Sequence, residues 1–182
     1  MKPSDILVLP GWQNSGAAHW QSLWQAQHGY VRVEQHDWMH PLRGDWSARL
    51  EEVLLDHAAA GGGPAVLVAH SLGCLLVAAW AAHSRNTHLA RAALLVAPGD
   101  PEREELGGVL SSWSPMALQA LPFPSVLLGS HNDPYCSVER ARFFAGAWGA
   151  EFVDYGECGH INADSGLGLW PDGHARLLAL CQ

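Results

Sequence analysis

Ser71 is the residue of this sequence whose surroundings are most typical of a nucleophile. It follows a short apolar run, residues 65–69, and precedes a segment with helical spacing, residues 72–82, with no loop between them. Small residues two positions before and after it, Ala69 and Gly73, permit a sharp turn that projects the hydroxyl at a helix N-terminus. Because serine is also a favoured helix N-cap, the pentapeptide alone leaves both interpretations open.

A serine hydroxyl is a weak nucleophile and needs a base and a carboxylate beside it. Asp133 follows the apolar run 125–128, and His160 follows the run 151–154. Taken singly, Asp133 fits a turn-capping residue and His160 fits an ordinary loop histidine. Their order after Ser71, at successive strand ends, is that of the α/β-hydrolase triad. We therefore predict Ser71 as nucleophile, His160 as base and Asp133 as the acid that orients it.

Acyl transfer also needs hydrogen-bond donors for the developing oxyanion. The residue after the nucleophile, Leu72, supplies one backbone N–H in this arrangement. The loop after the first apolar run contains Gly11, which gives the backbone freedom to turn the Trp12 N–H toward Ser71, although a glycine there is also an ordinary turn residue. Further candidates for substrate binding are Gly11, Gln13, His70 and Trp113.

The elements that must position these residues alternate between strands and helices. Short apolar runs, typical of buried parallel strands, cover residues 6–9, 31–35, 65–69, 92–97, 125–128 and 151–154. Helical apolar spacing is found at residues 20–24, 46–57, 72–82, 138–148 and 174–181. We predict one α/β-hydrolase-like domain over residues 1–182, a doubly wound, mostly parallel sheet of about six strands flanked by helices, whose ligands gather at the carboxyl ends of the strands. The chain has no room for the lid of larger hydrolases, because residues 98–124 are the only stretch between strands that is long enough, and these residues are expected to contribute to the substrate wall.

Composition and charge restrict the function classes. The 182 residues are 48% apolar and 15% charged, which suits a globular domain with its own core. The net charge is −8 and Lys2 is the only lysine, which disfavours nucleic acid and anionic membranes as partners. Residues 2–9 lack the long apolar region of a signal peptide, and no run approaches a membrane span. We expect a cytoplasmic protein with four reduced cysteines, because none are spaced as Cys-x-x-Cys.

Aromatic residues are frequent, with nine tryptophans in the chain. Four of them lie in or near loops of the predicted site, where large aromatic walls suit an apolar acyl group or an aromatic leaving group; these are Trp12, Trp20, Trp113 and Trp170. The tryptophans with helical spacing are expected to fill the core instead; these are Trp20, Trp24, Trp46, Trp80 and Trp148.

Two other chemistries have candidate residues. His36, Asp37 and His40 supply two or three metal ligands after a predicted strand, but no further ligand completes a catalytic zinc site. Cys74 and Cys158 flank the site in sequence; Cys74 is expected to pack against the sheet, and Cys158 lacks a base of its own. We therefore expect no metal and no organic cofactor. A protein-binding module on the same fold remains an alternative, although nothing in the sequence indicates a protein partner.

An ordered set of motifs resembles a known family over nearly the whole chain. The motifs are Pro-Gly-Trp-Gln-x-Ser at 10–15 with His19-Trp20, Ala-His-Ser-Leu-Gly-Cys at 69–74, Asp133-Pro-Tyr, Gly159-His160-Ile-Asn, Ser165-Gly166 and Trp170-Pro171. They are similar to those of the small serine hydrolases related to retinoblastoma-binding protein nine and the bacterial YdeN proteins, a branch of the α/β-hydrolase superfamily. One departure is Ala69, which replaces the first glycine of the usual Gly-x-Ser-x-Gly pattern.

The resemblance implies Ser71 as nucleophile, Asp133 as acid and His160 as base. With the residue pattern, it predicts a serine hydrolase that cleaves small carboxylic esters through an acyl-serine intermediate (EC class 3.1.1), with thioesters and amides as further candidates. The expected partner is a small-molecule ester or amide. Because the base must be neutral to accept a proton, we expect activity to increase with pH through the pKa of His160.

Overall fold

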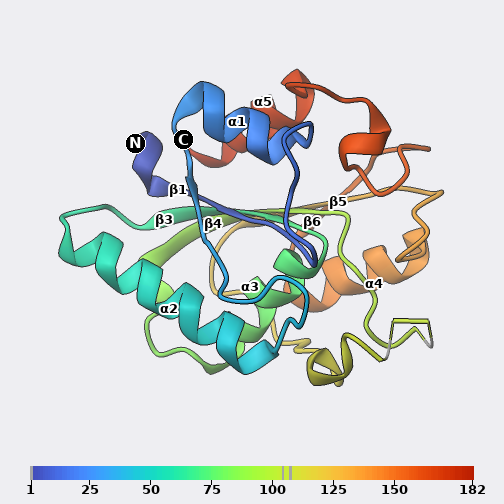
Figure 1. Cartoon of the computed structure of the whole chain (residues 1–182), viewed down its shortest axis with the longest axis horizontal. Helices are drawn as coiled ribbons and strands as arrows, with labels where there is room; N and C mark the ends of the chain where they lie inside the picture. Colours follow the sequence, from blue (N-terminus) through green and yellow to red (C-terminus); the bar gives the residue numbers. More distant parts are fainter. Residues whose placement is uncertain (1, 104, 107) are drawn as a thin grey trace.

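A six-stranded sheet forms the centre of the molecule in the computed structural model, which describes residues 2–103, 105–106 and 108–182 (Figure 1). All strand pairs are parallel and the order is β2-β1-β3-β4-β5-β6. The strands are β1 (Ile6–Leu9), β2 (Val31–Arg32), β3 (Ala65–His70), β4 (Ala90–Val96), β5 (Ser125–Gly129) and β6 (Glu151–Asp154). The predicted doubly wound, parallel α/β fold is confirmed.

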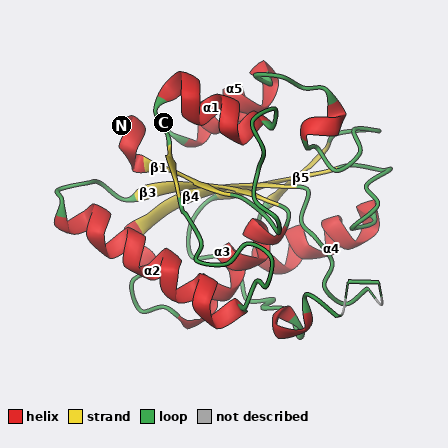
Figure 2. Cartoon of the chain, viewed as in Figure 1, coloured by secondary structure: helices red, strands yellow, loops and turns green. Residues whose placement is uncertain are grey.

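Five helices cover the two faces of this sheet (Figure 2). Helices α1 (Trp20–His28) and α5 (Pro171–Leu180) lie on one face. Helices α2 (Arg43–Ala59), α3 (Leu72–His83) and α4 (Val138–Trp148) lie on the other. Helix α5 begins three residues before its predicted start, because Pro171 provides a favourable first helical residue.

The strand at the edge of the sheet is shorter than predicted. Residues 31–35 were expected to form it, but β2 ends at Arg32. In the described part of the chain its only strand neighbour is β1, with Leu7 opposite Val31 and Val8 opposite Arg32. Since β1 itself ends at Leu9 and is followed by a proline, a longer β2 has no strand to pair with.

Alternate residues of the strands face two separate apolar layers. Leu7, Leu9, Leu67 and Ala69 pack with α2, α3 and α4 in what we call the α2–α4 cluster. Ile6, Val8, Val66 and Val68 pack with α1 and α5 in what we call the α1/α5 cluster. The five tryptophans predicted to fill the core are each at most 2% exposed, which confirms that prediction: Trp20 and Trp24 in the α1/α5 cluster, Trp46, Trp80 and Trp148 in the α2–α4 cluster.

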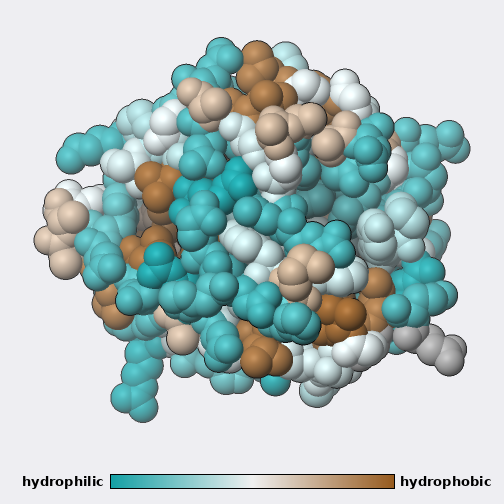
Figure 3. All heavy atoms as spheres, viewed as in Figure 1, coloured by the Kyte–Doolittle hydropathy of each residue, from teal (hydrophilic) through white to brown (hydrophobic). Residues whose placement is uncertain are grey.

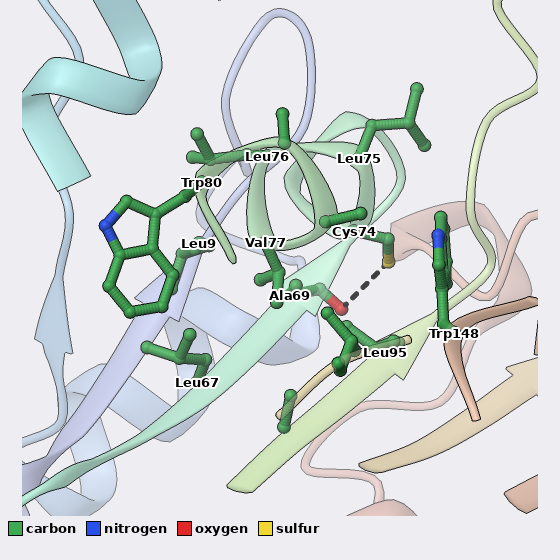
Figure 4. Packing of buried hydrophobic residues seen from close by; sticks show 14 of the residues in the cluster. Leu9, Leu67, Ala69, Cys74, Leu75, Leu76, Val77, Trp80, Leu95 and Trp148 are labelled. Atoms are coloured by element: carbon green, nitrogen blue, oxygen red, sulfur yellow. Dashed lines mark hydrogen bonds between the residues drawn. The ribbon is translucent and has the colours of Figure 1, made fainter. Parts of the chain in front are cut away.

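Helix α3 is the most buried helix around the site. Its side chains from Leu72 to Trp80 are all buried, and Figure 4 shows this helix packed directly on β3. Cys74 points from α3 toward the sheet, where its Sγ lies 3.6 Å from the carbonyl oxygen of Ala69, as expected for a packed thiol. The helix that follows Ser71 is therefore held rigidly against the strand that precedes it.

The outer surface is mostly polar. On the face seen in Figure 3, apolar residues form separate small patches among hydrophilic side chains. Within the described ranges, no helix has the length and hydrophobicity to cross a bilayer. The segment between β4 and β5 contains the short 3₁₀ turn Ser111–Trp113; residues 104 and 107 of this predicted substrate wall lie outside the described residues.

Candidate active site

Ser71 occupies a sharp turn between β3 and α3. Its backbone angles are φ 54° and ψ −122°, a conformation that costs free energy for a residue with a side chain and is typical of functional turns. Its N–H donates to the carbonyl oxygen of Val96 at 3.0 Å, which ties the turn to β4. Among the described residues the hydroxyl makes no cap to α3. The helix-cap interpretation of Ser71 therefore has no hydrogen bond to support it.

Two glycines permit the close packing of this turn. A Cβ on Gly73 would lie 2.3 Å from the carbonyl oxygen of Leu9, so only glycine fits where α3 meets the end of β1. A Cβ on Gly11 would lie 2.7 Å from the Cβ of Ser71 and 3.1 Å from the backbone nitrogen of Leu72. The loop after β1 thus lies directly against the nucleophile candidate.

Asp133 and His160 form a buried pair. Both oxygens of the Asp133 carboxylate accept from Nδ1 of His160, at 3.0 and 2.8 Å. An ionised carboxylate only accepts, so Nδ1 carries the proton and Nε2 is left as an acceptor. Asp133 also accepts from the N–H of Tyr135 at 2.8 Å. The same carboxylate therefore both caps its own turn and orients His160.

A cavity of about 320 Å³ brings Ser71 and His160 together. In the described part of the chain no hydrogen bond joins the Ser71 hydroxyl to His160, and such bonds are often loose before substrate binds. Of the other predicted site residues, the cavity is also lined by Gly11, Trp12, Gln13, His70 and Leu72. Asp133 lies behind His160, outside the lining.

Trp113 is a correction to the sequence-based prediction, because it does not line the cavity. It is 1% exposed, its Nε1 donates to the carbonyl oxygen of Pro41 at 2.7 Å, and its ring packs edge-on against Trp46. The 3₁₀ turn directs this indole into the α2–α4 cluster. The described residues of segment 98–124 that do line the cavity are Gly99, Leu106 and Leu110. Trp20 and Trp170, also expected near the site, are buried in the α1/α5 cluster and do not line the cavity either.

The loop that carries His160 is strained and held by several hydrogen bonds. Gly159 and Ile161, on either side of His160, have φ angles of 57° and 45°. Nε2 of His70 donates to the carbonyl oxygen of His160 at 2.8 Å, and Nε1 of Trp20 donates to that of Ile161 at 2.8 Å. No pattern in the sequence indicates Trp20 as a positioning residue, and His70 was predicted only as a substrate contact.

Three imidazole rings stand side by side along the cavity. The His19 and His160 rings lie 4.7 and 4.8 Å from the His70 ring. Burial lowers the pKa of His19 to about 3 and lowers the pKa of His70 well below its usual value. Both are therefore neutral near pH 7. His19 was missed as a lining residue; its only sequence signal was its place in the motif next to Trp20.

The loop between β1 and α1, which carries Gly11 and Trp12, is held by its own hydrogen bonds. Gln13 and Asn14 have φ angles of 67° and 66°, and the Gln13 N–H donates to the carbonyl oxygen of Trp38 at 3.1 Å. The Arg32 guanidinium donates to Asn14 Oδ1 at 2.7 Å. As the first residue of α3, Leu72 has no intrahelical partner for its N–H. The loop is thus fixed where Trp12 and Leu72 lie together at the cavity.

The competing metal site finds no support in this geometry. His40 Nδ1 lies 3.0 Å from Asp37 Oδ2, and both side chains are more than half exposed. Across residues 2–103, 105–106 and 108–182, no cluster of three or more His, Cys, Asp or Glu residues forms a metal site. The alternative cysteine nucleophiles are poorly suited as well, since burial raises the pKa values of Cys74 and Cys158 and keeps both thiols protonated.

Comparison with known proteins agrees with the observed fold. The sequence model of the serine hydrolase family matches residues 6–179. A YdeN-like hydrolase from Pectobacterium atrosepticum is 31% identical, with a TM-score of 0.82 over 96% of this chain and 89% of that one. The B. subtilis ydeN product is 17% identical, with a TM-score of 0.73 over 96% and 97%.

An esterase from a Rhodococcus species shares the fold at 14% identity, with a TM-score of 0.60 over 85% of this chain and 82% of that one. No curated protein matches the chain. The match to the family over nearly the whole sequence, together with the parallel sheet, shows that the chain belongs to the serine hydrolase family, as a YdeN-like member of the α/β-hydrolase superfamily.

Proposed function

We propose that this hydrolase is a carboxylesterase of small esters that acts through an acyl-serine intermediate. The observation that supports this most directly is the buried Asp133–His160 pair, whose histidine lines the same cavity as Ser71. An imidazole held by a carboxylate is the arrangement that activates a serine hydroxyl. The strained turn at Ser71 adds a second, independent sign of a working nucleophile.

The proposed reaction has two stages. Nε2 of His160 takes the proton from Oγ of Ser71 as Oγ attacks the ester carbonyl, and the N–H groups of Leu72 and Trp12 stabilise the oxyanion. The tetrahedral intermediate collapses when His160 returns the proton to the departing alcohol. Water, activated by the same imidazole, then releases the acid and restores Ser71.

Asp133 has a positioning and electrostatic role in this scheme. Its carboxylate keeps the His160 proton on Nδ1, so that Nε2 is unprotonated when substrate arrives. It also stabilises the imidazolium that forms during attack. Both effects depend on burial, and the Asp133 side chain is only 2% exposed.

Structural neighbours favour esters over other acyl substrates. The Rhodococcus protein is an esterase, and a carboxylesterase from Bacillus cereus shares the fold at 16% identity, with a TM-score of 0.55 over 87% of this chain and 81% of that one. At this identity the likeness concerns the fold alone, so the preference for esters is part of the proposal. A non-catalytic binding module is the alternative. Such a module would not require a buried Asp133–His160 pair beside a serine in a strained turn.

A fluorophosphonate probe at neutral pH distinguishes these two functions. We expect the wild-type protein to be labelled and to hydrolyse p-nitrophenyl acetate, while Ser71→Ala does neither and keeps its melting temperature. Ser111→Ala, an exposed serine outside the cavity lining, is the matched control and should be labelled like the wild type. A folded wild-type protein without labelling would support the binding module instead.

A further inference from the structure

The cavity beside Ser71 has two walls of different chemistry. Trp12, Leu106 and Leu110 form an apolar wall, and all three pack against the α2–α4 cluster. The polar wall is formed by His19, His70, His160 and Asn162. It lies toward the other face of the sheet, because the His19 and His70 rings contact Trp20 of the α1/α5 cluster. The other polar side chains of the lining, apart from Ser71, are Gln13, Asn14 and Tyr135.

The cavity offers no fixed charge to a ligand. Among its described lining residues there is no lysine, arginine, aspartate or glutamate. Two of the three imidazoles, His19 and His70, are neutral near pH 7 because burial lowers their pKa values. A charged group on the substrate would lose its hydration here without finding a counter-charge, which is costly. The group bound in the cavity is therefore uncharged.

The chemistry of the reaction decides which part of the ester meets which wall. His160 must protonate the departing alcohol, so the alcohol leaves along the polar wall. The oxyanion points to the N–H groups of Leu72 and Trp12. The remaining substituent of the carbonyl carbon, the acyl chain, then extends toward the apolar wall.

We propose that the acyl chain of an uncharged ester packs against the apolar wall and that Leu110 sets its maximum length. This inference rests on the esterase function proposed above. The cavity of about 320 Å³ must hold the acyl chain and part of the alcohol. The acyl chain is therefore short.

Leu110 is suited to this role because it cannot move aside. It is 4% exposed, and its N–H donates to the carbonyl oxygen of Leu106 at 2.9 Å. Its own carbonyl oxygen accepts from the N–H of Trp113, also at 2.9 Å, and Trp113 is anchored in the α2–α4 cluster. Leu106 is less buried, so we place the length limit at Leu110.

Acyl-length profiles of two opposite substitutions test the proposal. The measured quantity is kcat/KM for p-nitrophenyl acetate, butyrate, hexanoate, octanoate and decanoate. Leu110→Ala should move the optimum to longer chains, with a gain of about fourfold for each additional methylene that becomes buried. Leu110→Phe should move it to shorter chains. Leu118→Ala, at an exposed leucine of the same segment outside the cavity lining, is the matched control and should keep the wild-type profile.

The outcomes separate this inference from the proposed function. If wild type hydrolyses the esters but neither Leu110 variant moves the optimum, the acyl chain does not lie on the apolar wall and the inference is overturned. If wild type hydrolyses none of them, the esterase function itself is refuted. Should Leu110→Ala unfold, Leu110→Val, which removes less volume at the same position, must show a smaller shift to longer chains. An unchanged optimum in a folded Leu110→Val then refutes the proposal.

Discussion

Replacing Gly11 with alanine should damage catalysis without unfolding the protein. The new methyl would lie 2.7 Å from the Cβ of Ser71, and ordinary contacts begin near 3.4 Å, so the two backbones must separate by about 0.7 Å. The Ser71 turn cannot retreat, since Gly73 already lies against the backbone of Leu9. The loop carrying Gly11 and Trp12 must therefore move instead.

The size of the effect follows from what that movement displaces. The backbone N–H of Trp12 is one of the two proposed oxyanion donors, and loss of one such donor costs about 10²–10³ in kcat. A misplacement of about 1 Å in reacting groups has a similar effect. For a shift of about 0.7 Å we expect kcat to fall by about 100-fold, or about 2.7 kcal/mol of transition-state stabilisation.

The assay compares two alanine substitutions in one loop. Gly16 has open space around its Cβ position, so Gly16→Ala should keep wild-type kcat and melting temperature. Gly11→Ala should lower kcat for p-nitrophenyl acetate, with a smaller effect on KM. If Gly11→Ala retains kcat within threefold of wild type, the loop after β1 does not supply the oxyanion donor, and this reasoning is refuted.

Two predictions concern the imidazoles behind His160. His70→Phe keeps a ring in place but leaves the carbonyl oxygen of His160 without its donor, a loss of about 1–3 kcal/mol that should appear as lower kcat at similar KM; lower stability in urea with unchanged kcat would show that His70 does not position His160. Acid should destabilise the protein below pH 6.5. His19 and His70 become protonated there in the unfolded chain but stay neutral in the folded protein, because burial lowers their pKa values. The slope from each histidine approaches about 1.4 kcal/mol per pH unit near pH 5, and urea unfolding at about pH 5 to 7 measures it. His19→Asn, which keeps the acceptor that caps α1, should remove its own share of that slope, and an unchanged slope would contradict the assignment.

The order of the site residues was predictable because a parallel sheet collects its strand ends at one edge. Once the apolar runs before Ser71, Asp133 and His160 are recognised as strands β3, β5 and β6, their side chains must emerge on the same side of the molecule. The glycines at positions 11 and 73 were predictable for a similar local reason, since each follows or forms a sharp turn.

The direction of loop side chains was not predictable from local pattern. Trp113 and Leu110 stand three residues apart in a segment without strand or helix periodicity, and only packing against Trp46 and Pro41 turns the indole inward while Leu110 faces the cavity. The same holds for β2, whose length depends on where its neighbour β1 ends.

The sequence alone was thus enough to place the predicted site residues at the ends of strands, because strand periodicity and turn chemistry depend on a few neighbouring residues. The tertiary structure decided how the His160 loop is held. Trp20 and Ile161 lie 141 positions apart along the chain, and His70 and His160 lie 90 apart, yet each pair shares a hydrogen bond. Such contacts depend on how α1 and β3 pack around the loop, and no local pattern records that packing.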